Sequence, residues 1–251
     1  MSLYKSKNPA LSEKVFNQVK VIDSSTELMT IKGTVNKIAF LGLIVLASSL
    51  TTWNLYQTNP DNQVINPYVI GATIAAFVVA TIIIFKNTTA PYLSPIYCFL
   101  EGLTLGGLSA LMEANFPGVV LQSIILTFSI LFSLLIIYRL GIIKASENFK
   151  LIISSATAGI VIYYWISLIG RLFEFELPYI HDNSIGGIFF SLFVVLIAAL
   201  NLVIDFDFIE RGAESKSPKY MEWYAAFGLM VTIIWLYIEI LRLLAKSRSK
   251  K

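Results

Sequence analysis

The chain has 251 residues and a net charge of +3, and 56% of its residues are hydrophobic while only 14% are charged. A typical soluble domain carries about 25% charged residues, so this composition excludes an ordinary soluble protein. The single cysteine, Cys98, excludes an intramolecular disulfide, and a single histidine, His181, argues against a zinc site.

Seven apolar runs follow one another along the chain, and a helix of about 20 residues is enough to cross a hydrocarbon core. They are residues 38–53, 68–85, 92–112, 118–138, 151–170, 185–206 and 223–244. The first two are short and are expected to extend into their flanks. Lipid offers no partner to an open sheet edge, and the runs lack the alternation of barrel strands. The sequence therefore predicts an all-α integral membrane protein with seven transmembrane helices.

Polar segments flank this apolar region, and they divide the chain into three parts. Residues 1–35 contain five lysines and no early apolar core, so we interpret them as a cytosolic N-terminal extension and not as a secretory signal. The first helix is expected to begin near Thr34 or Asn36. Residues 36–245 form the transmembrane domain, and residues 246–251 form a basic C-terminal tail.

The distribution of lysine and arginine predicts the orientation in the membrane. Basic residues gather in the N-terminal extension and in alternate loops, whereas the opposite loops contain only Arg171. The positive-inside rule then places the N-terminus in the cytoplasm. Seven spans put the C-terminus outside even though its tail is basic. We favour seven spans because the last run is long enough to cross; the alternative is a final segment that crosses incompletely.

Acidic residues inside the spans are the candidate functional groups, because a charged side chain at a helix centre costs about 2.5–3.5 kcal/mol on insertion. In the sixth span Asn201 and Asp205 lie four residues apart on one face, and no basic residue lies within a turn of Asp205 on that face. Asp207 points elsewhere and is expected to pair with Arg211 near the headgroups. Asp205 is therefore the stronger functional candidate of the two aspartates.

The seventh span carries two glutamates. Glu239 follows a stripe of small and hydroxylated residues that includes Gly228 and Thr232, and Arg242 lies three residues beyond it. A local Glu239–Arg242 salt bridge is thus an alternative to a functional role. Glu222 lies at the start of the span, where an acid complements the positive end of a helix.

The third span contains Glu101, with Tyr97 and Thr104 as nearby polar residues. Gly102 and Gly106 form a small-xxx-small face that favours close helix packing. Glu101 either lines a cavity or makes a packing hydrogen bond, and the sequence leaves both possibilities open.

Sequence signatures of enzymes are missing. The chain contains no His-Glu-x-x-His motif, no glycine-rich phosphate loop and no plausible Ser–His pair. It also lacks the Tyr-Asp and Gly-x-Gly-Asp motifs that intramembrane aspartyl proteases carry. We therefore expect no enzymatic activity and no cofactor.

Several motifs together resemble the transmembrane Bax inhibitor motif family, specifically a bacterial-type branch, over essentially all seven spans. The motifs are residues 90–97, 100–103, 116–118, 204–212, 218–224 and 236–244. The resemblance implies six helices packed around a central seventh, a bacterial cytoplasmic membrane, and the activity of a pH-sensitive calcium-leak channel. Two aspartates on the sixth and seventh spans form the proton-sensing pair of this family. By motif Asp205 matches the first, and Glu239 matches the second with one additional methylene.

The spacing of these two acids makes their pairing a geometric question. Asp205 and Glu239 are 34 residues apart. If the hairpin turns symmetrically near Glu214, the two differ in depth by about 22 Å at 1.5 Å per helical residue. The pairing requires the loop to take up most of the residues on the Asp205 side; otherwise Glu222 is the alternative partner of Asp205.

The sequence thus favours a passive cation leak, calcium in particular, gated by protonation of Asp205 and Glu239. Asp207, Glu222, Glu101 and Arg242 are secondary candidates. The alternative is a non-transporting membrane protein that binds other membrane proteins, for instance to modulate a membrane protease or a stress response. The expected partners are the lipid bilayer, calcium ions and other membrane proteins; basic residues lie beside the spans, so no nucleic acid is expected.

Overall fold

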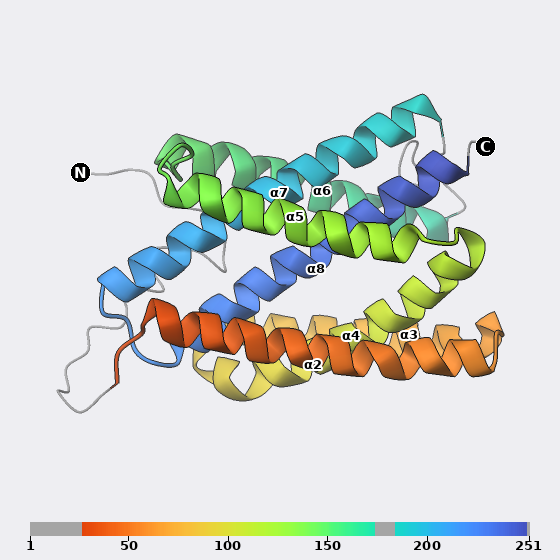
Figure 1. Ribbon diagram of the computed structural model, residues 1–251, viewed down its shortest axis with the longest axis horizontal. Coiled ribbons are helices and arrows are strands. Elements are labelled where there is room, and N and C mark those ends of the chain that lie inside the picture. Colours follow the sequence, from red (N-terminus) through yellow and green to blue (C-terminus); the bar gives the residue numbers. More distant parts are fainter. Residues whose placement is uncertain (1–26, 174–183, 250–251) are drawn as a thin grey trace. The chain divides into compact units, whose positions relative to one another are not determined.

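The computed structural model describes residues 27–173 and 184–249, and seven long helices account for most of them (Figure 1). They are α2 (Ile31–Thr58), α3 (Asn62–Phe85), α4 (Ala90–Asn115), α5 (Val119–Arg139), α6 (Glu147–Leu172), α7 (Ile185–Glu214) and α8 (Met221–Arg248), with a short 3-10 helix, η1 (Asn87–Thr89), before α4. All seven are long and apolar enough to cross a membrane. The all-α integral membrane fold is therefore confirmed. Most of the N-terminal extension, His181, Lys250 and Lys251 lie outside the described residues.

Most of the helices extend beyond the apolar runs. The helix α2 begins at Ile31, with Thr30 as its N-cap, and the Thr30 hydroxyl accepts a hydrogen bond from the Gly33 N–H at 3.0 Å. Thr34 and Asn36, expected near the entrance, lie inside the helix because Thr30 supplies the cap one turn earlier. At the other end, α8 continues to Arg248 and includes the first residues of the predicted basic tail.

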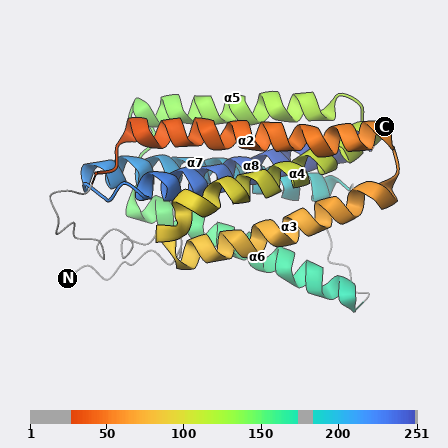
Figure 2. The same ribbon diagram turned by 90° about the horizontal axis from the view of Figure 1, so that it is seen from below.

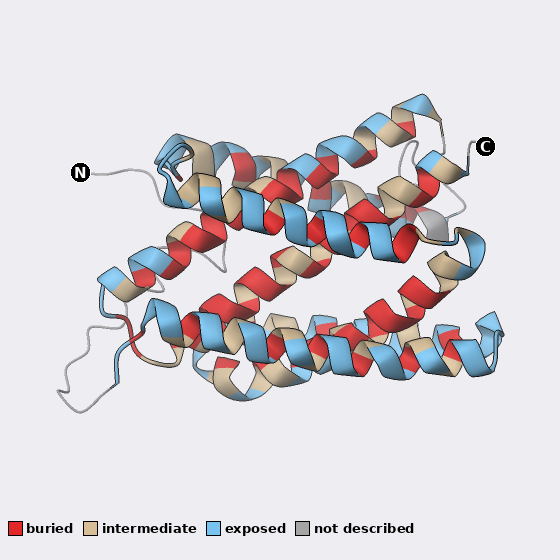
Figure 3. Ribbon diagram, in the orientation of Figure 1, coloured by how far each residue is buried: buried red, intermediate tan, exposed pale blue. Residues whose placement is uncertain are grey.

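Buried residues are concentrated in three helices (Figure 3). In the apolar 18-residue window of each span, 61% of α7 and 50% of α4 and α8 are buried, against 17–22% of α2, α3, α5 and α6. The outward faces of the latter carry large apolar side chains such as Leu43 and Phe132, as lipid contact requires. The helix α8, implied to be central, is among the buried helices, and α7 is buried still more.

The chain divides into two compact units, each of which contains part of α7 and part of α8. In the described chain, the first unit consists of Gly118–Ile204 and the residues from Thr232 onward, and so contains α5 and α6. The second consists of the residues up to Pro117 together with Asp205–Val231, and so contains α2, α3 and α4.

In the second unit α4 packs against both α2 and α3 (Figure 2). Its glycine face is the contact with α2: a Cβ atom at Gly102 would lie 1.8 Å from the Ser48 Oγ, and one at Gly106 would lie 2.0 Å from the Ser49 carbonyl oxygen. Thr52 crosses the same contact and donates a hydrogen bond to the Leu103 carbonyl at 2.8 Å. The predicted small-xxx-small face is therefore a helix-packing face.

Candidate functional site

Three carboxylates are buried within the described parts of α7 and α8. Asp205 on α7 is 5% exposed, and Glu222 and Glu239 on α8 are 0% and 1% exposed. Isolated charges in such surroundings are costly, so each is expected to have compensating partners. Their surroundings differ, and the differences indicate what each acid can do.

Glu239 lies at the centre of a polar network in the first unit. Its Oε1 accepts hydrogen bonds from the Tyr164 hydroxyl at 3.0 Å, from the Trp235 indole N–H at 3.3 Å, and from Arg242 Nη1 at 2.9 Å. Arg242 Nη1 also lies 3.0 Å from Oε2. One cation and two neutral donors thus compensate the buried carboxylate.

Tyr164 makes this network a link between helices. Its hydroxyl accepts a hydrogen bond from Arg242 at 2.8 Å while it donates to Glu239, and the Arg242 guanidinium lies 5.3 Å from the centre of its ring. Tyr164 belongs to α6, whereas Glu239 and Arg242 belong to α8. The Glu239 side chain is 1% exposed and that of Arg242 is 31% exposed, so the acid lies inside and the cation lies at the edge of the protein.

The sequence predicted only part of the Glu239 network. The Glu239–Arg242 salt bridge, which the spacing of three residues offered as the alternative to a functional role, is present at 2.9 Å. Tyr164 and Trp235 were not assigned to it. A tyrosine hydroxyl within an apolar span needs a polar partner, so the sequence could have marked Tyr164 as hydrogen-bonded within the membrane, although not to which residue.

On α7 the predicted polar face is also present. Asn201, one turn before Asp205, donates hydrogen bonds of 2.8 Å to the Thr157 hydroxyl on α6 and to the Ile197 carbonyl. The expected Asp207–Arg211 ion pair is present at 2.8 Å, and the Arg211 side chain is about half exposed. Asp207 therefore has a local partner near the helix end.

Pairing of Asp205 with Glu239 was expected to require a long loop soon after Asp205, and the structure has a helix there instead. The helix α7 continues without interruption to Glu214, so the residues on the Asp205 side of the loop are helical. Asp205 and Glu239 belong to different compact units. The Asp205–Glu239 pair stays a prediction.

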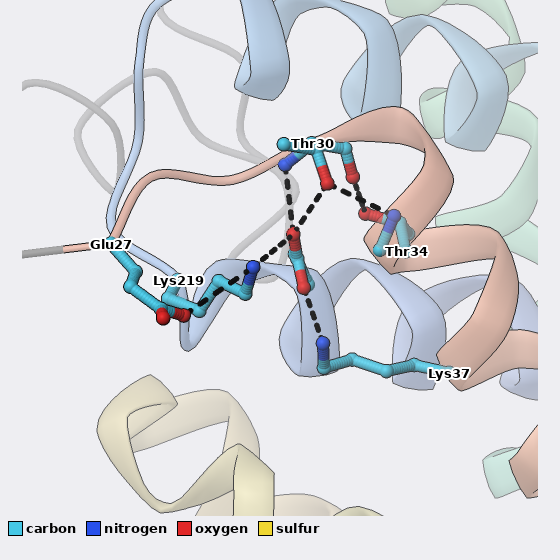
Figure 4. Close-up of polar contacts among 7 residues, drawn as sticks. Glu27, Thr30, Thr34, Lys37 and Lys219 are labelled. Atoms are coloured by element: carbon cyan, nitrogen blue, oxygen red, sulfur yellow. Dashed lines mark hydrogen bonds and ion pairs between the residues drawn. The ribbon is translucent and has the colours of Figure 1, made fainter.

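Glu222 is the most completely buried acid of the described residues, and its partners are Thr30 and Lys37 at the start of α2 and Lys219 in the loop before α8 (Figure 4). Its Oε1 accepts hydrogen bonds from the Thr30 N–H and the Thr30 hydroxyl, both at 2.9 Å, and lies 3.5 Å from Lys219 Nζ. Its Oε2 forms an ion pair with Lys37. Glu222 was expected to complement the start of its own helix; the structure shows that it also occupies the positive N-terminal end of α2.

Glu101 lies on α4, four residues after Tyr97, which the sequence indicated as a nearby polar residue. Tyr97 is thus one turn earlier on the same helix, and its ring packs edge-on against Phe227 of α8 with centroids 4.9 Å apart. Thr104 instead lies 3.2 Å from the Thr73 hydroxyl of α3. Glu101 thus lies beside a tyrosine that packs α4 against α8.

No group of three or more His, Cys, Asp or Glu side chains that could hold a metal ion is found within residues 27–173 and 184–249.

A sequence model of the family described as Bax inhibitor 1 like matches residues 8–249, which is nearly the whole chain. The chain belongs to this family, which confirms the resemblance of its motifs. Neither a curated protein nor a solved structure matches the chain.

Proposed function

We propose that this protein is a pH-sensitive channel that leaks cations, calcium among them, and that Asp205 and Glu239 are its sensing carboxylates. The observation that supports the proposal most directly is the Glu239 network. There a single titratable acid, buried in an apolar span, links α6 to α8. The calcium specificity and the pairing with Asp205 rest on family membership.

Protonation of Glu239 would weaken the link between α6 and α8. A neutral carboxyl group gives up most of its attraction for Arg242, whose side chain is 31% exposed and can turn outward. The Tyr164 hydroxyl would then lose its charged acceptor. A local change of charge would in this way change the packing of two helices, which is how many switches act.

Asp205 is the second sensing carboxylate in this proposal. It is buried on α7, one turn after an asparagine that contacts α6, so its charge state would act on the neighbouring polar face. Carboxylate oxygens are hard ligands that suit Ca²⁺. We place the protein in a bacterial cytoplasmic membrane with its N-terminus in the cytoplasm, from the family branch and from the distribution of lysine and arginine.

The test is calcium flux from proteoliposomes measured between about pH 5 and pH 8. The wild-type protein should leak calcium with a clear pH dependence, and Glu239→Gln and Asp205→Asn should each abolish or strongly reduce that dependence. Asp207→Asn is the matched control, because this acid is paired locally with Arg211. A pH dependence that is unaltered in both Glu239→Gln and Asp205→Asn would refute the sensor role.

A second candidate is a non-transporting protein that binds other membrane proteins, for instance to modulate a membrane protease or a stress response. The close α2–α4 contact favours it, because backbone and hydroxyl atoms fill the space beside Gly102 and Gly106, as expected of a rigid scaffold. Folded wild-type protein that leaks no cation at any pH would support this candidate over the channel.

A further inference from the structure

The Glu222 carboxylate is a junction between two segments that are far apart in the sequence. Thr30 lies 192 residues and Lys37 lies 185 residues before Glu222, and Lys219 precedes it by three. The Lys37 side chain is 16% exposed and that of Glu222 is 0% exposed. Salt screens a partly buried pair far less than a surface pair, so the attraction between Lys37 and Glu222 should persist at cellular ionic strength.

The backbone fastens the same two segments a second time. The Met29 N–H donates to the Ser217 carbonyl at 2.7 Å, and the Lys219 N–H donates to the Glu27 carbonyl at 2.9 Å. These two hydrogen bonds form an isolated antiparallel β-bridge in which Leu28 lies opposite Pro218. The residues before α2 are thus attached to the loop between α7 and α8, directly before the first turn of α8.

The glycine at position 33 leaves room for the Glu222 carboxylate. A Cβ atom there would lie 2.2 Å from Glu222 Oε1 and 2.5 Å from Oε2. The acid therefore occupies the space that a side chain would take, and it lies against the backbone at the N-terminal end of α2.

We propose that Glu222 is a latch that holds the segment from Glu27 to Lys37 on the start of α8, and that its release frees this end of α8 to move. The charged groups that face the latch are Lys37 on α2, Lys219 in the loop, and Glu27 in the segment before α2, which pairs with Lys219 at 3.5 Å. The idea that release changes the leak rests on the proposed function; the existence of the latch does not.

Amide hydrogen exchange of the full-length protein in nanodiscs tests the latch. The Thr30 N–H donates directly to Glu222, so exchange in the peptide covering residues 27–34 reports on this contact. Glu222→Gln should speed this exchange by about tenfold or more, as local opening becomes easier. Glu214→Gln is the control, because Glu214 is exposed at the end of α7 and lies outside the latch; it should change the exchange by less than about twofold.

A reversible crosslink separates the latch from a general loss of folding. Leu28→Cys with Pro218→Cys, in a Cys98→Ser background, should form a disulfide across the bridge. Oxidation should slow the exchange of residues 27–34 in Glu222→Gln, and reduction should restore the fast exchange. If Glu222→Gln does not fold, Lys37→Met removes the partly buried cation of the ion pair and serves in its place.

The outcomes distinguish the two proposals. Exchange in Glu222→Gln and Lys37→Met that equals that of the wild type overturns the latch, whatever the flux. With a leaking wild-type protein, Glu222→Gln should change the calcium leak at least about threefold at fixed pH, and oxidation of the crosslink should reverse the change; an unchanged leak overturns the link to α8 movement. A wild-type protein without flux overturns the proposed channel, and the exchange measurement still decides whether the latch exists.

Discussion

The Cα of Gly33 lies so close to the Glu222 carboxylate that a Cβ atom there would be 2.2 Å from Oε1. Gly33→Ala is therefore expected to push the carboxylate away from Thr30 and Lys37. Because hydrogen bonds to charged groups are worth about 1.5–3 kcal/mol, we expect the free energy of unfolding to fall by about 1–3 kcal/mol. Thermal or denaturant unfolding in detergent measures this change.

Gly42 on the same helix provides the matched control for Gly33. A Cβ atom at Gly42 would meet nothing within 4 Å. Gly42→Ala should be neutral or should stabilise by up to about 1 kcal/mol, since alanine favours a helix over glycine. Equal effects of the two substitutions would contradict the close contact at Gly33.

Two helix ends share one geometry but differ in residue type. After α5, Gly141 has a φ of 70°, and the Ile142 N–H bonds to the Ile137 carbonyl at 3.2 Å. After α7, Lys216 has a φ of 54°, and the Ser217 N–H bonds to the Gly212 carbonyl at 3.1 Å. Both are Schellman ends, in which glycine is the favoured residue at the left-handed position.

Opposite substitutions at these two positions should therefore have opposite effects. Gly141→Ala should lower the free energy of unfolding by about 1 kcal/mol through backbone strain alone, because a Cβ atom there meets nothing within 4 Å. Lys216→Gly should raise it by up to about 1 kcal/mol. Unfolding midpoints of the two variants decide the matter, and a stabilising Gly141→Ala would show that the left-handed conformation is not maintained in solution.

The seven spans could be predicted because each is a continuous apolar run, and hydropathy depends only on local composition. The helix ends were less predictable, since Thr30 caps α2 from within a polar segment. Ion pairs within one turn, such as Glu239–Arg242 and Asp207–Arg211, followed from spacing alone. Tyr164 could not be assigned to Glu239 because periodicity does not indicate which helices are neighbours.

The same limit applies to Glu222. An acid at the start of a helix is favoured by the positive end of that helix, so nothing in the sequence indicated another partner of Glu222. That interpretation was correct but incomplete. Its main partners lie 185 and 192 residues earlier in the chain, and only the packing of α2 beside α8 brings them together. Contacts between residues so far apart in the chain are the part of this site that could not be predicted from one sequence.

Tyr164→Phe removes one hydroxyl from the Glu239 network while keeping the ring under Arg242. The hydroxyl donates to Glu239 and accepts from Arg242, so its loss should cost about 1–3 kcal/mol of the free energy of unfolding. The effect should be much smaller in a Glu239→Gln background, because the charged acceptor is already gone. A double-mutant cycle measures this coupling, and strictly additive effects would contradict a shared network.

Lys246 is a basic residue of the predicted tail, yet it is only 5% exposed. Its Nζ donates to the Ser191 hydroxyl at 2.9 Å and to the Gly187 carbonyl at 3.2 Å, both on α7. This charge is used inside the protein, so it should count little in the positive-inside balance that a free tail would affect. Lys246→Met should therefore leave the orientation of a C-terminal reporter unchanged.

The same substitution should reduce stability. Lys246→Met removes the donor to two buried acceptors and should lower the free energy of unfolding by about 1–3 kcal/mol. Ser247→Ala is the control, since Ser247 is exposed and its hydroxyl donates to the Leu243 carbonyl of its own helix; its effect should stay within about 0.5 kcal/mol. Unfolding in detergent measures both variants, and a Lys246→Met protein as stable as the wild type would show that the end of α8 is not held by this lysine.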